Sequence, residues 1–210
     1  MSRKKTKPAV TSRNPERTSA RILAAALAEF AAAGFAGARV DAIAKRAGTN
    51  KRMLYHYFGD KEGLFRAVLR KKISERQVWG ESLSGNPEDN LPFWFEAACK
   101  DPEWVRMLEW ESLQNPKRKV IDEKERLQVV ERALGRIRQR QERGQLSAEF
   151  DPRHLMLTMR SLTMFPMAFP QLTRLIMGRE VFDPQFQRER SEFLKKFGTL
   201  LRAPNAPRRH

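Results

Sequence analysis

The sequence has few of the residues that build covalent or metal-held frameworks. Its single cysteine, Cys99, excludes an intrachain disulfide and a cysteine-cluster metal site, and it is typical of a reducing compartment. Only three histidines occur, and no carboxylate stands at ligand spacing from His56, so we expect neither a metal centre nor a cofactor. No stretch approaches the roughly 18 consecutive apolar residues of a membrane span, and the basic N-terminus has no signal-peptide core. We therefore expect a soluble, cytoplasmic protein without a membrane partner.

Groups that catalyse reactions are equally scarce. An active site needs a nucleophile, a base and oxyanion donors that converge, or a set of metal ligands. The chain offers scattered histidines, one cysteine within an apolar stretch, no glycine-rich phosphate loop and no serine nucleophile motif. These absences predict that the protein is not an enzyme.

Positive charge, in contrast, is plentiful and unevenly distributed. The 210 residues include 41 Lys and Arg against 25 Asp and Glu, a net charge of +16. The first 72 residues carry +12 of this excess and the other 138 carry +4. Such asymmetry indicates an N-terminal part that binds a polyanion, although a solvated basic surface is the alternative.

Helix signals divide the N-terminal part into short elements. Residues 1–14 carry five basic side chains, no acid and no apolar periodicity, so we predict a flexible basic arm that either contacts phosphates or only solubilises the chain. Capping residues, apolar spacing and glycine stops then predict four helices. These run from Pro15 to Gly34, over 40–47, over about 50–57, and from Asp60 onward.

The second and third of these helices are joined by a turn of helix-turn-helix length at residues 47–50, which contains the expected glycine, Gly48. In that motif the second helix enters the major groove of DNA and reads base edges. The helix over about 50–57 is polar and aromatic with a narrow apolar stripe, which suits a recognition helix better than a core helix. We therefore predict a DNA-binding head.

A specific pattern lies in this head: the run Leu54–Phe58 is followed by Lys61-Glu62 and then Leu64-Phe65. With its flanks, from Arg21 to Val68, the pattern resembles the TetR family of bacterial transcriptional regulators. The resemblance implies an all-α homodimer that binds a palindromic operator, usually as a repressor released by a small ligand. Its implied division is an arm at 1–14, a helix-turn-helix domain at 15–60 and a helical regulatory and dimerisation domain at 61–210.

The DNA-contacting set follows from the recognition helix and from the resemblance. We expect Arg52 to contact a base and Lys51 to contact either a base or a phosphate, while Lys61 matches a phosphate contact of the family. Tyr57 fits the core edge and DNA equally well, and Phe58 fits the core. The full predicted set is Arg39, Thr49, Asn50, Lys51, Arg52, Tyr55, His56 and Lys61.

The family usually has Ser or Thr where Ala38-Arg39-Val40 opens the second helix, and that residue caps the helix and holds a DNA phosphate. Here Arg39 is expected to hold the phosphate by charge instead.

The rest of the chain shows a loop at 82–90 and helices but no credible strand, so the fold class is all-α. These helices are expected from about 91, from 101 to before Pro116, over about 118–143, from 151 to 166, from 170 to 178, and from 183 onward.

The last helix carries an apolar seam at alternating spacings of four and three residues, which is typical of helix pairing. The resemblance implies that the helices from about 151 and 184 pair across a dimer, and packing inside one subunit is the alternative. The predicted interface residues are Leu155, Leu162, Phe186, Phe193, Phe197 and Leu200.

An aromatic and methionine-rich set in the same part has the composition of an adaptable apolar pocket, although such residues also build ordinary cores. From it we predict a site for a small apolar or aromatic effector. The predicted lining residues are Trp94, Trp104, Met107, Trp110, Met156, Met159, Arg160 and Thr163.

The main alternative to a regulator is a protein that coats DNA or RNA and binds it without sequence preference. The base-reading capacity of Lys51 and Arg52 on a short helix argues against it. The sequence therefore favours a sequence-specific transcriptional regulator.

Overall fold

A computed structural model describes residues 15–83, 85–114 and 120–203. Every regular element in these ranges is helical, which confirms the all-α fold class. The predicted arm at residues 1–14 lies outside them. The elements are α1 (Pro15–Gly37), α2 (Val40–Arg46), α3 (Lys51–Phe58), α4 (Lys61–Ser82), α5 (Pro87–Lys100), α6 (Pro102–Gln114), α7 (Glu123–Glu142), α8 (Pro152–Ala168), α9 (Pro170–Met177) and α10 (Pro184–Leu200).

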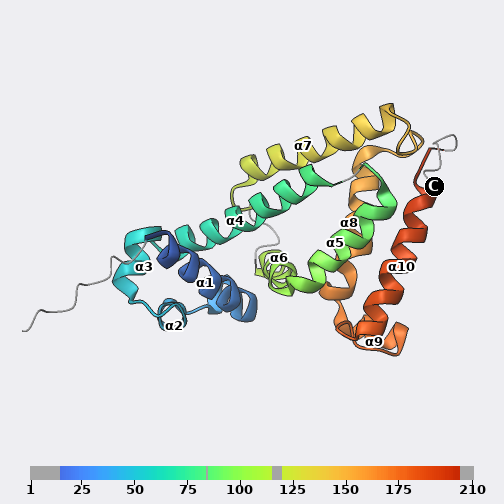
Figure 1. The fold of residues 1–210 in the computed structure, drawn as a ribbon. Helices are drawn as coiled ribbons and strands as arrows, with labels where there is room; N and C mark the ends of the chain where they lie inside the picture. The colour runs from blue at the N-terminus through green and yellow to red at the C-terminus, as the bar shows by residue number, and fades with distance from the viewer. Residues whose placement is uncertain (1–14, 84, 115–119, 204–210) are drawn as a thin grey trace, which may run out of the picture.

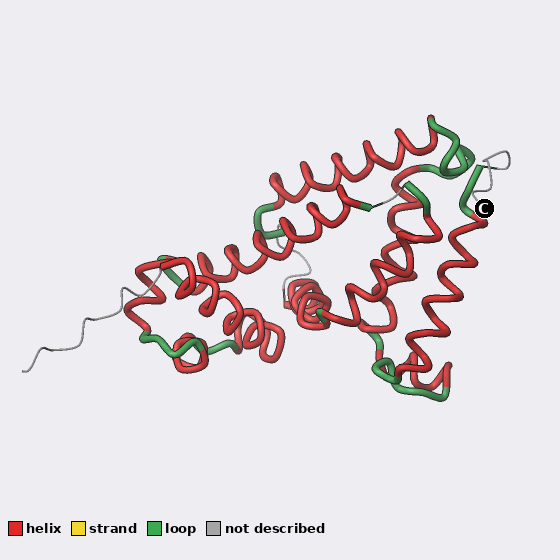
Figure 2. Tube along the Cα trace, viewed as in Figure 1, coloured by secondary structure: helices red, strands yellow, loops and turns green. Residues whose placement is uncertain are grey.

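Figure 1 shows α1, α2 and α3 gathered at one end of the molecule and α5, α8 and α10 at the other, with α6 between them. The long helix α4 begins in the first group and reaches the second, and α7 runs alongside it (Figures 1 and 2). One continuous helix thus connects the two ends.

Side-chain capping explains where several helices begin. The carboxylates of Asp60, Asp151 and Asp183 accept hydrogen bonds from main-chain N–H groups in the first turns of α4, α8 and α10. Each bond satisfies a donor that a helix start leaves without a partner. The predicted starts of these three helices at residues 60, 151 and 183 therefore agree with the structure.

Two apolar cores hold the helices together. The first combines α1, α2, α3 and α6 with the N-terminal half of α4, around Ile22, Phe30 and Leu54, each 0% exposed. The second joins α5, α8 and α10, where Phe95 and Phe186 meet edge to face with ring centroids 6.2 Å apart. Because α4 enters the first core and α6 contributes Met107 to it, the N-terminal helices are anchored on the rest of the chain.

Helix α1 is long and apolar enough to cross a membrane by length and composition alone. Its apolar residues Ile22, Ala26 and Phe30 are instead the centre of the first core. The helix therefore serves as a core helix, and its chain direction changes at Gly34, where φ is 67° as the predicted stop requires.

Beyond α1, which ends at Gly37 after its change of direction at Gly34, the boundaries of α5, α7 and α8 differ from the prediction. Helix α5 begins at Pro87, inside the predicted loop at 82–90, because proline suits the first helical position and acidic residues follow it. Helix α7 begins at Glu123 instead of about 118, because Asp122 has a φ of 51° and its carboxylate is held by Arg70 at 2.7 Å.

Helix α8 continues past Pro166 to Ala168, although a proline removes one intrahelical hydrogen bond. The carbonyl that loses its donor is that of Leu162, four residues earlier. Arg190 of α10 donates a hydrogen bond of 2.9 Å to that oxygen. A partner from another helix thus allows α8 to continue.

Candidate functional site

The helix-turn-helix geometry is present in α2 and α3. The turn between them passes through Gly48, whose φ of 59° favours glycine, and the N–H of Thr49 donates to the carbonyl of Ala44 at 3.0 Å. Ile43 and Leu54, both 0% exposed, hold the two helices against α1 and α4. Helix α3 therefore lies on a fixed platform with its other faces in solvent.

Arg21 of α1 holds this turn in place through hydrogen bonds, a role that the sequence analysis did not predict. Its Nε donates to the carbonyl oxygen of Ala47 at 3.0 Å, and its Nη2 donates to the carbonyl of Gly48 at 2.9 Å. The partners are 26 and 27 positions away, so no local pattern announces the contact. The guanidinium satisfies carbonyls at the end of α2 that have no helical donor.

The solvent face of α3 presents most of the predicted DNA-contacting residues. Lys51, Arg52, Tyr55 and His56 are all exposed. Lys51 Nζ lies 3.3 Å from a carboxylate oxygen of Asp41, so the first turns of α2 and α3 are tied by an exposed ion pair. The result is a row of basic and hydrogen-bonding groups on one exposed face.

Asn50 has a different task from its neighbours. Its side-chain oxygen accepts a hydrogen bond of 2.8 Å from the N–H of Met53, which makes Asn50 the N-cap of α3. The side-chain oxygen is thereby occupied, whereas the amide group keeps its donors. The structure thus gives Asn50 a helix-starting role beside its predicted DNA contact.

The other predicted DNA-contacting residues flank α3. Arg39 is exposed at the start of α2, and Thr49 is half-buried in the turn. Lys61, at the start of α4, donates from Nζ to the carbonyl of Ala36 at 3.1 Å and lies 5.1 Å from the ring centre of Phe35. Its ammonium group is therefore held against the C-terminal end of α1.

Tyr57 and Phe58 are half-buried and pack against the first core. For Phe58 this packing agrees with the expected core role. For Tyr57 it supports the core-edge alternative.

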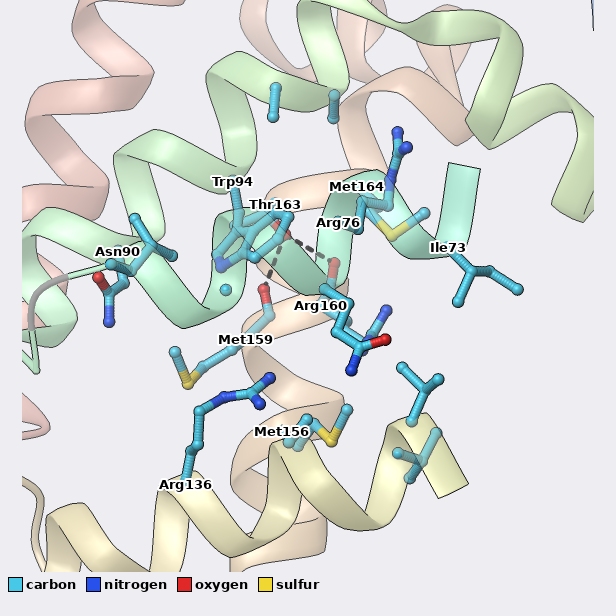
Figure 3. A pocket seen from close by; sticks show the side chains of 18 of the residues that line it. Ile73, Arg76, Asn90, Trp94, Arg136, Met156, Met159, Arg160, Thr163 and Met164 are labelled. Atoms are coloured by element: carbon cyan, nitrogen blue, oxygen red, sulfur yellow. Dashed lines mark hydrogen bonds between the residues drawn. The ribbon is translucent and has the colours of Figure 1, made fainter. Parts of the chain in front are cut away.

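A cavity of about 280 Å³ lies between α4, α5, α6, α7 and α8 (Figure 3). Six of the eight predicted pocket residues line it, and apolar side chains from α7 complete its walls. Those six are Trp94, Trp104, Met156, Met159, Arg160 and Thr163.

The pocket prediction is wrong for Met107 and Trp110, which do not line the cavity and pack towards α1 instead. Met107 is 0% exposed within the first core, and Trp110 Nε1 donates to the carbonyl of Ala31 on α1 at 3.2 Å. Helix α6 lies between the cavity on one side and α1 on the other, and Trp104, which also belongs to the first core, lines the cavity together with Leu108. Composition alone gave no means of separating the two faces.

Sequence reasoning also missed most of the arginines around the cavity. Arg76, Arg126, Arg136 and Arg140 line it together with the predicted Arg160. The available signal was weak, because charged residues on a long helix are usually solvated. The hydroxyl of Thr163 is committed, since it donates within α8 towards the carbonyls of Met159 and Arg160.

The junction between α5 and α6 is fixed by charge. Asp101 accepts hydrogen bonds from Lys72 Nζ at 2.8 Å and from Arg76 Nη2 at 2.9 Å, both from α4. Burial by itself would raise the pKa of the Asp101 carboxyl, but these hydrogen bonds outweigh it and hold the pKa below its ordinary value. The Arg76 guanidinium also stacks 4.5 Å from the ring centre of Trp104, so α4 is tied to both helices beside the cavity.

The predicted interface residues fall into two groups. Leu155 and Phe186 are 4% and 1% exposed within this one chain, so they are core residues and the interface prediction is wrong for them. Their helices pack on α5, which covers the faces that carry them. Phe193 and Leu200 are 49% and 73% exposed, whereas Leu162 and Phe197 are half-buried.

Comparison with protein families agrees with this geometry. Residues 22–68 match the family described as bacterial regulatory proteins of the TetR family, and residues 93–196 match the tetracyclin repressor-like C-terminal domain. A repressor named SCO4008 from Streptomyces coelicolor is 34% identical over 173 residues, which cover 80% of this chain and 88% of that protein. The chain belongs to the TetR family.

Other relatives match over shorter stretches. The transcriptional repressor NicS of Pseudomonas putida is 34% identical over 114 residues, which are 51% of this chain and 54% of that protein. The regulator RutR of Escherichia coli is 41% identical over 86 residues, or 41% and 37% of the two chains. This TetR-family protein is therefore a DNA-binding transcriptional regulator, and its family consists of regulators and not of enzymes.

Solved structures agree on the fold. The regulator SCO4942 from Streptomyces coelicolor superposes with a TM-score of 0.72 at 26% identity, covering 89% of this chain and 99% of its own. FadR from Bacillus subtilis, solved in complex with stearoyl-CoA, has a TM-score of 0.60 at 16% identity and covers 83% and 96% of the two chains. The second likeness concerns the fold alone.

Proposed function

We propose that this TetR-family protein is a homodimeric, cytoplasmic repressor that binds a palindromic operator and leaves it when a small effector occupies the cavity. The observation that carries the proposal is the exposed row of Lys51, Arg52, Tyr55 and His56 on a recognition helix whose other face is anchored in the core. A short helix held in this way suits the major groove, where arginine pairs with guanine.

An exposed apolar face supports the dimer. Its exposed apolar side chains lie on α8, α9, α10 and the loop before α10, and exposed apolar surface gathered in one part of a folded chain is typical of contacts with another protein. A two-fold dimer would also present two recognition helices to an inverted repeat. The exposed residues are Leu157, Phe165, Phe169, Leu172, Leu175, Ile176, Phe182, Phe193 and Leu200.

The ties around α4 support a release mechanism. Helix α4 carries Leu64 and Phe65 into the core of the DNA-binding head and carries Arg76 to the wall of the cavity. A ligand that moved Arg76 relative to Asp101 would therefore displace a helix on which the head is packed. Because packed helices shift as units, a small movement at the cavity would change the spacing of the two recognition helices.

Selection of bound sequences from random duplex DNA tests the function. We expect an inverted-repeat site whose affinity exceeds that of random duplex by about 10³-fold or more at physiological salt. If the affinity for the best site exceeded that for random duplex by only about tenfold or less, the result would favour a protein that coats nucleic acid without sequence preference. Repeating the binding with candidate effectors then tests release.

Substitution on the apolar face tests the dimer. Leu157→Asp on α8 should shift the protein to a monomer in analytical ultracentrifugation, because a buried charge opposes association. Val78→Asp on α4 is the matched control, since Leu157 and Val78 are 63% and 59% exposed. A dimer that survives Leu157→Asp would place the interface elsewhere.

A further inference from the structure

We infer that the cavity takes a small organic anion with an apolar body, whose acidic group is bound by Arg136, Arg140 and Arg160. This inference deepens the proposed function, because it names the chemical class of the effector. It also replaces the predicted apolar or aromatic effector with an amphipathic acid.

The first argument is the charge of the wall. Five arginines line the cavity, and none of the described residues that line it is an aspartate or glutamate. Every carboxylate side chain of the protein lies within the described ranges. The wall is therefore cationic, which suits an anion and opposes a cation.

The second argument is that three of these arginines lack a counter-charge. Arg76 is paired with Asp101 at 2.9 Å, and Arg126 is paired with Glu111. Arg136, Arg140 and Arg160 form no ion pair with any carboxylate side chain in the described residues. Three guanidinium groups from α7 and α8 are thus free to bind a ligand.

The third argument is the electrostatic cost of this arrangement. Arg160 is exposed, and its pKa is lowered by desolvation and by the neighbouring charges of Arg76 and Arg126. Burial followed by the charge of Arg136 lowers the pKa of Arg140. Neighbouring cations repel one another, and a bound anion would relieve this repulsion.

The fourth argument is the shape of the remaining wall. In Figure 3 the Arg136 side chain extends from α7 towards the centre of the cavity, with Met156 and Met159 of α8 nearby and Trp94 across from it. Guanidinium groups bind carboxylate or phosphate oxygens in a two-pronged fashion, while the indole and thioether groups receive an apolar body. The volume of about 280 Å³ lies just below the usual range of about 300–1,000 Å³ for ligand pockets, so the acid is small.

The test uses full-length protein and matched probes. Octanoate, octyl phosphate and 1-naphthoate are the acids, octanol is the neutral control and octylamine is the cationic control. Binding is followed by tryptophan fluorescence, because Trp94 and Trp104 line the cavity, and by thermal melting. At least one acid should bind about tenfold or more tightly than octanol, and octylamine should not bind. Comparing octanoate with octyl phosphate shows whether the site prefers a carboxylate or a phosphate.

Three variants assign the binding to the arginines. Arg136→Gln and Arg160→Gln should each weaken acid binding by about tenfold, leave octanol binding unchanged and leave the melting temperature equal or higher. Arg138→Gln is the matched control, because Arg138 lies on the same helix and pairs with Glu131 at 3.7 Å. It should bind the acid as the parent protein does.

The outcomes separate this inference from the proposed function. If an acid binds through these arginines but does not release operator DNA, effector release fails and the ligand class stands. If octanol or octylamine binds as tightly as the acids, or releases DNA when the acids do not, the ligand class is overturned while regulation stands. Binding of none of the three acids at about 1 mM, or unchanged acid binding in both variants, also overturns it.

Discussion

Arg190 of α10 donates a hydrogen bond of 2.9 Å to the main-chain carbonyl oxygen of Leu162 on α8. Pro166 stands four residues after Leu162 and has no N–H to offer that oxygen. A side chain from one helix thus completes the hydrogen bonding of another beside the apolar face. The contact explains how α8 passes a proline without ending.

This relationship predicts a stability effect that depends on the proline. Arg190→Met should destabilise the protein by about 1 kcal/mol, because the Leu162 carbonyl loses its donor. In a Pro166→Ala background the same substitution should cost clearly less, since the introduced alanine supplies a helical N–H to that carbonyl. Urea unfolding of the four proteins of this cycle measures the coupling, and strictly additive costs would contradict the assigned role.

Close approach of α10 to the start of α5 predicts opposite effects at two helical glycines. A Cβ at Gly198 would lie 2.5 Å from the Cα of Glu88 and 2.7 Å from the carbonyl carbon of Pro87, both main-chain atoms. Gly198→Ala should therefore destabilise by about 1–3 kcal/mol, although alanine favours helix. Gly135→Ala on α7, where a Cβ meets nothing within 4 Å, should stabilise by up to about 1 kcal/mol. Thermal unfolding of both variants checks the difference in sign.

The Asp101 cluster predicts a pH dependence. Its carboxyl has a pKa held below 3.8 in the folded protein, so the ionised form contributes stability that is complete well above pH 3.8 and is lost as the pH falls through the folded value. Asp101→Asn should cost about 1–3 kcal/mol at pH 7, and the gap from the parent should shrink below about pH 4.

Denaturant unfolding at pH 7, 5 and about 3.5 measures this gap. The control is Glu96→Gln, which removes an exposed carboxylate 3.9 Å from Lys100 and should have little effect on stability at any of these values. A gap for Asp101→Asn that stays constant with pH would mean that its charge is not the stabilising feature.

Two residues of the DNA-binding head should affect DNA binding in different ways when they are replaced. Arg52→Ala should relax the sequence preference at one position by about 1–3 kcal/mol, because the proposed contact with a base is removed. Lys61→Ala should weaken binding to all sequences and reduce the dependence on salt, because a phosphate contact is removed. Lys71→Ala on α4, which removes an ion pair with Glu75, is the control. Equal losses of specificity from Arg52→Ala and Lys61→Ala would refute these roles.

Replacing Arg21 should reduce DNA affinity in a third way. Arg21→Met should lower affinity for all sequences by about tenfold without changing the salt dependence, because it loosens the turn and removes no phosphate contact. Arg17→Met, one helical turn earlier on the exposed surface, should bind DNA as the parent does. A changed salt slope for Arg21→Met would show that Arg21 touches DNA itself. Titration of labelled operator at several salt concentrations gives both quantities.

Local signals predicted the elements well where the cause is local. Asp60, Asp151 and Asp183 cap helices because a carboxylate needs only the N–H groups two or three residues later. The start of α7 was predicted too early, because Asp122 takes up a positive φ beside arginines of α4 that are more than 50 residues away. No local pattern contains that partner.

The cavity shows the same limit. Aromatic and methionine composition identified Trp94 and Met156, but it could not exclude Met107, because all have apolar side chains that suit a core or a pocket. It also missed Arg136 and Arg140. Considered on their own helix, these charged residues are expected to face solvent. Which face of a helix borders a space depends on the helices packed around it.

By itself, the sequence determined that this is an all-helical protein with a basic helix-turn-helix head, because helical periodicity, capping residues and turn glycines act within a few residues. The same short range made Lys51, Arg52 and His56 recognisable as candidate DNA-contacting residues. Only the tertiary structure decided that Leu155 and Phe186 are core residues and that unpaired arginines face a cavity. The physical reason is that burial and charge pairing are set by residues distant in the chain, which only the packed helices bring together.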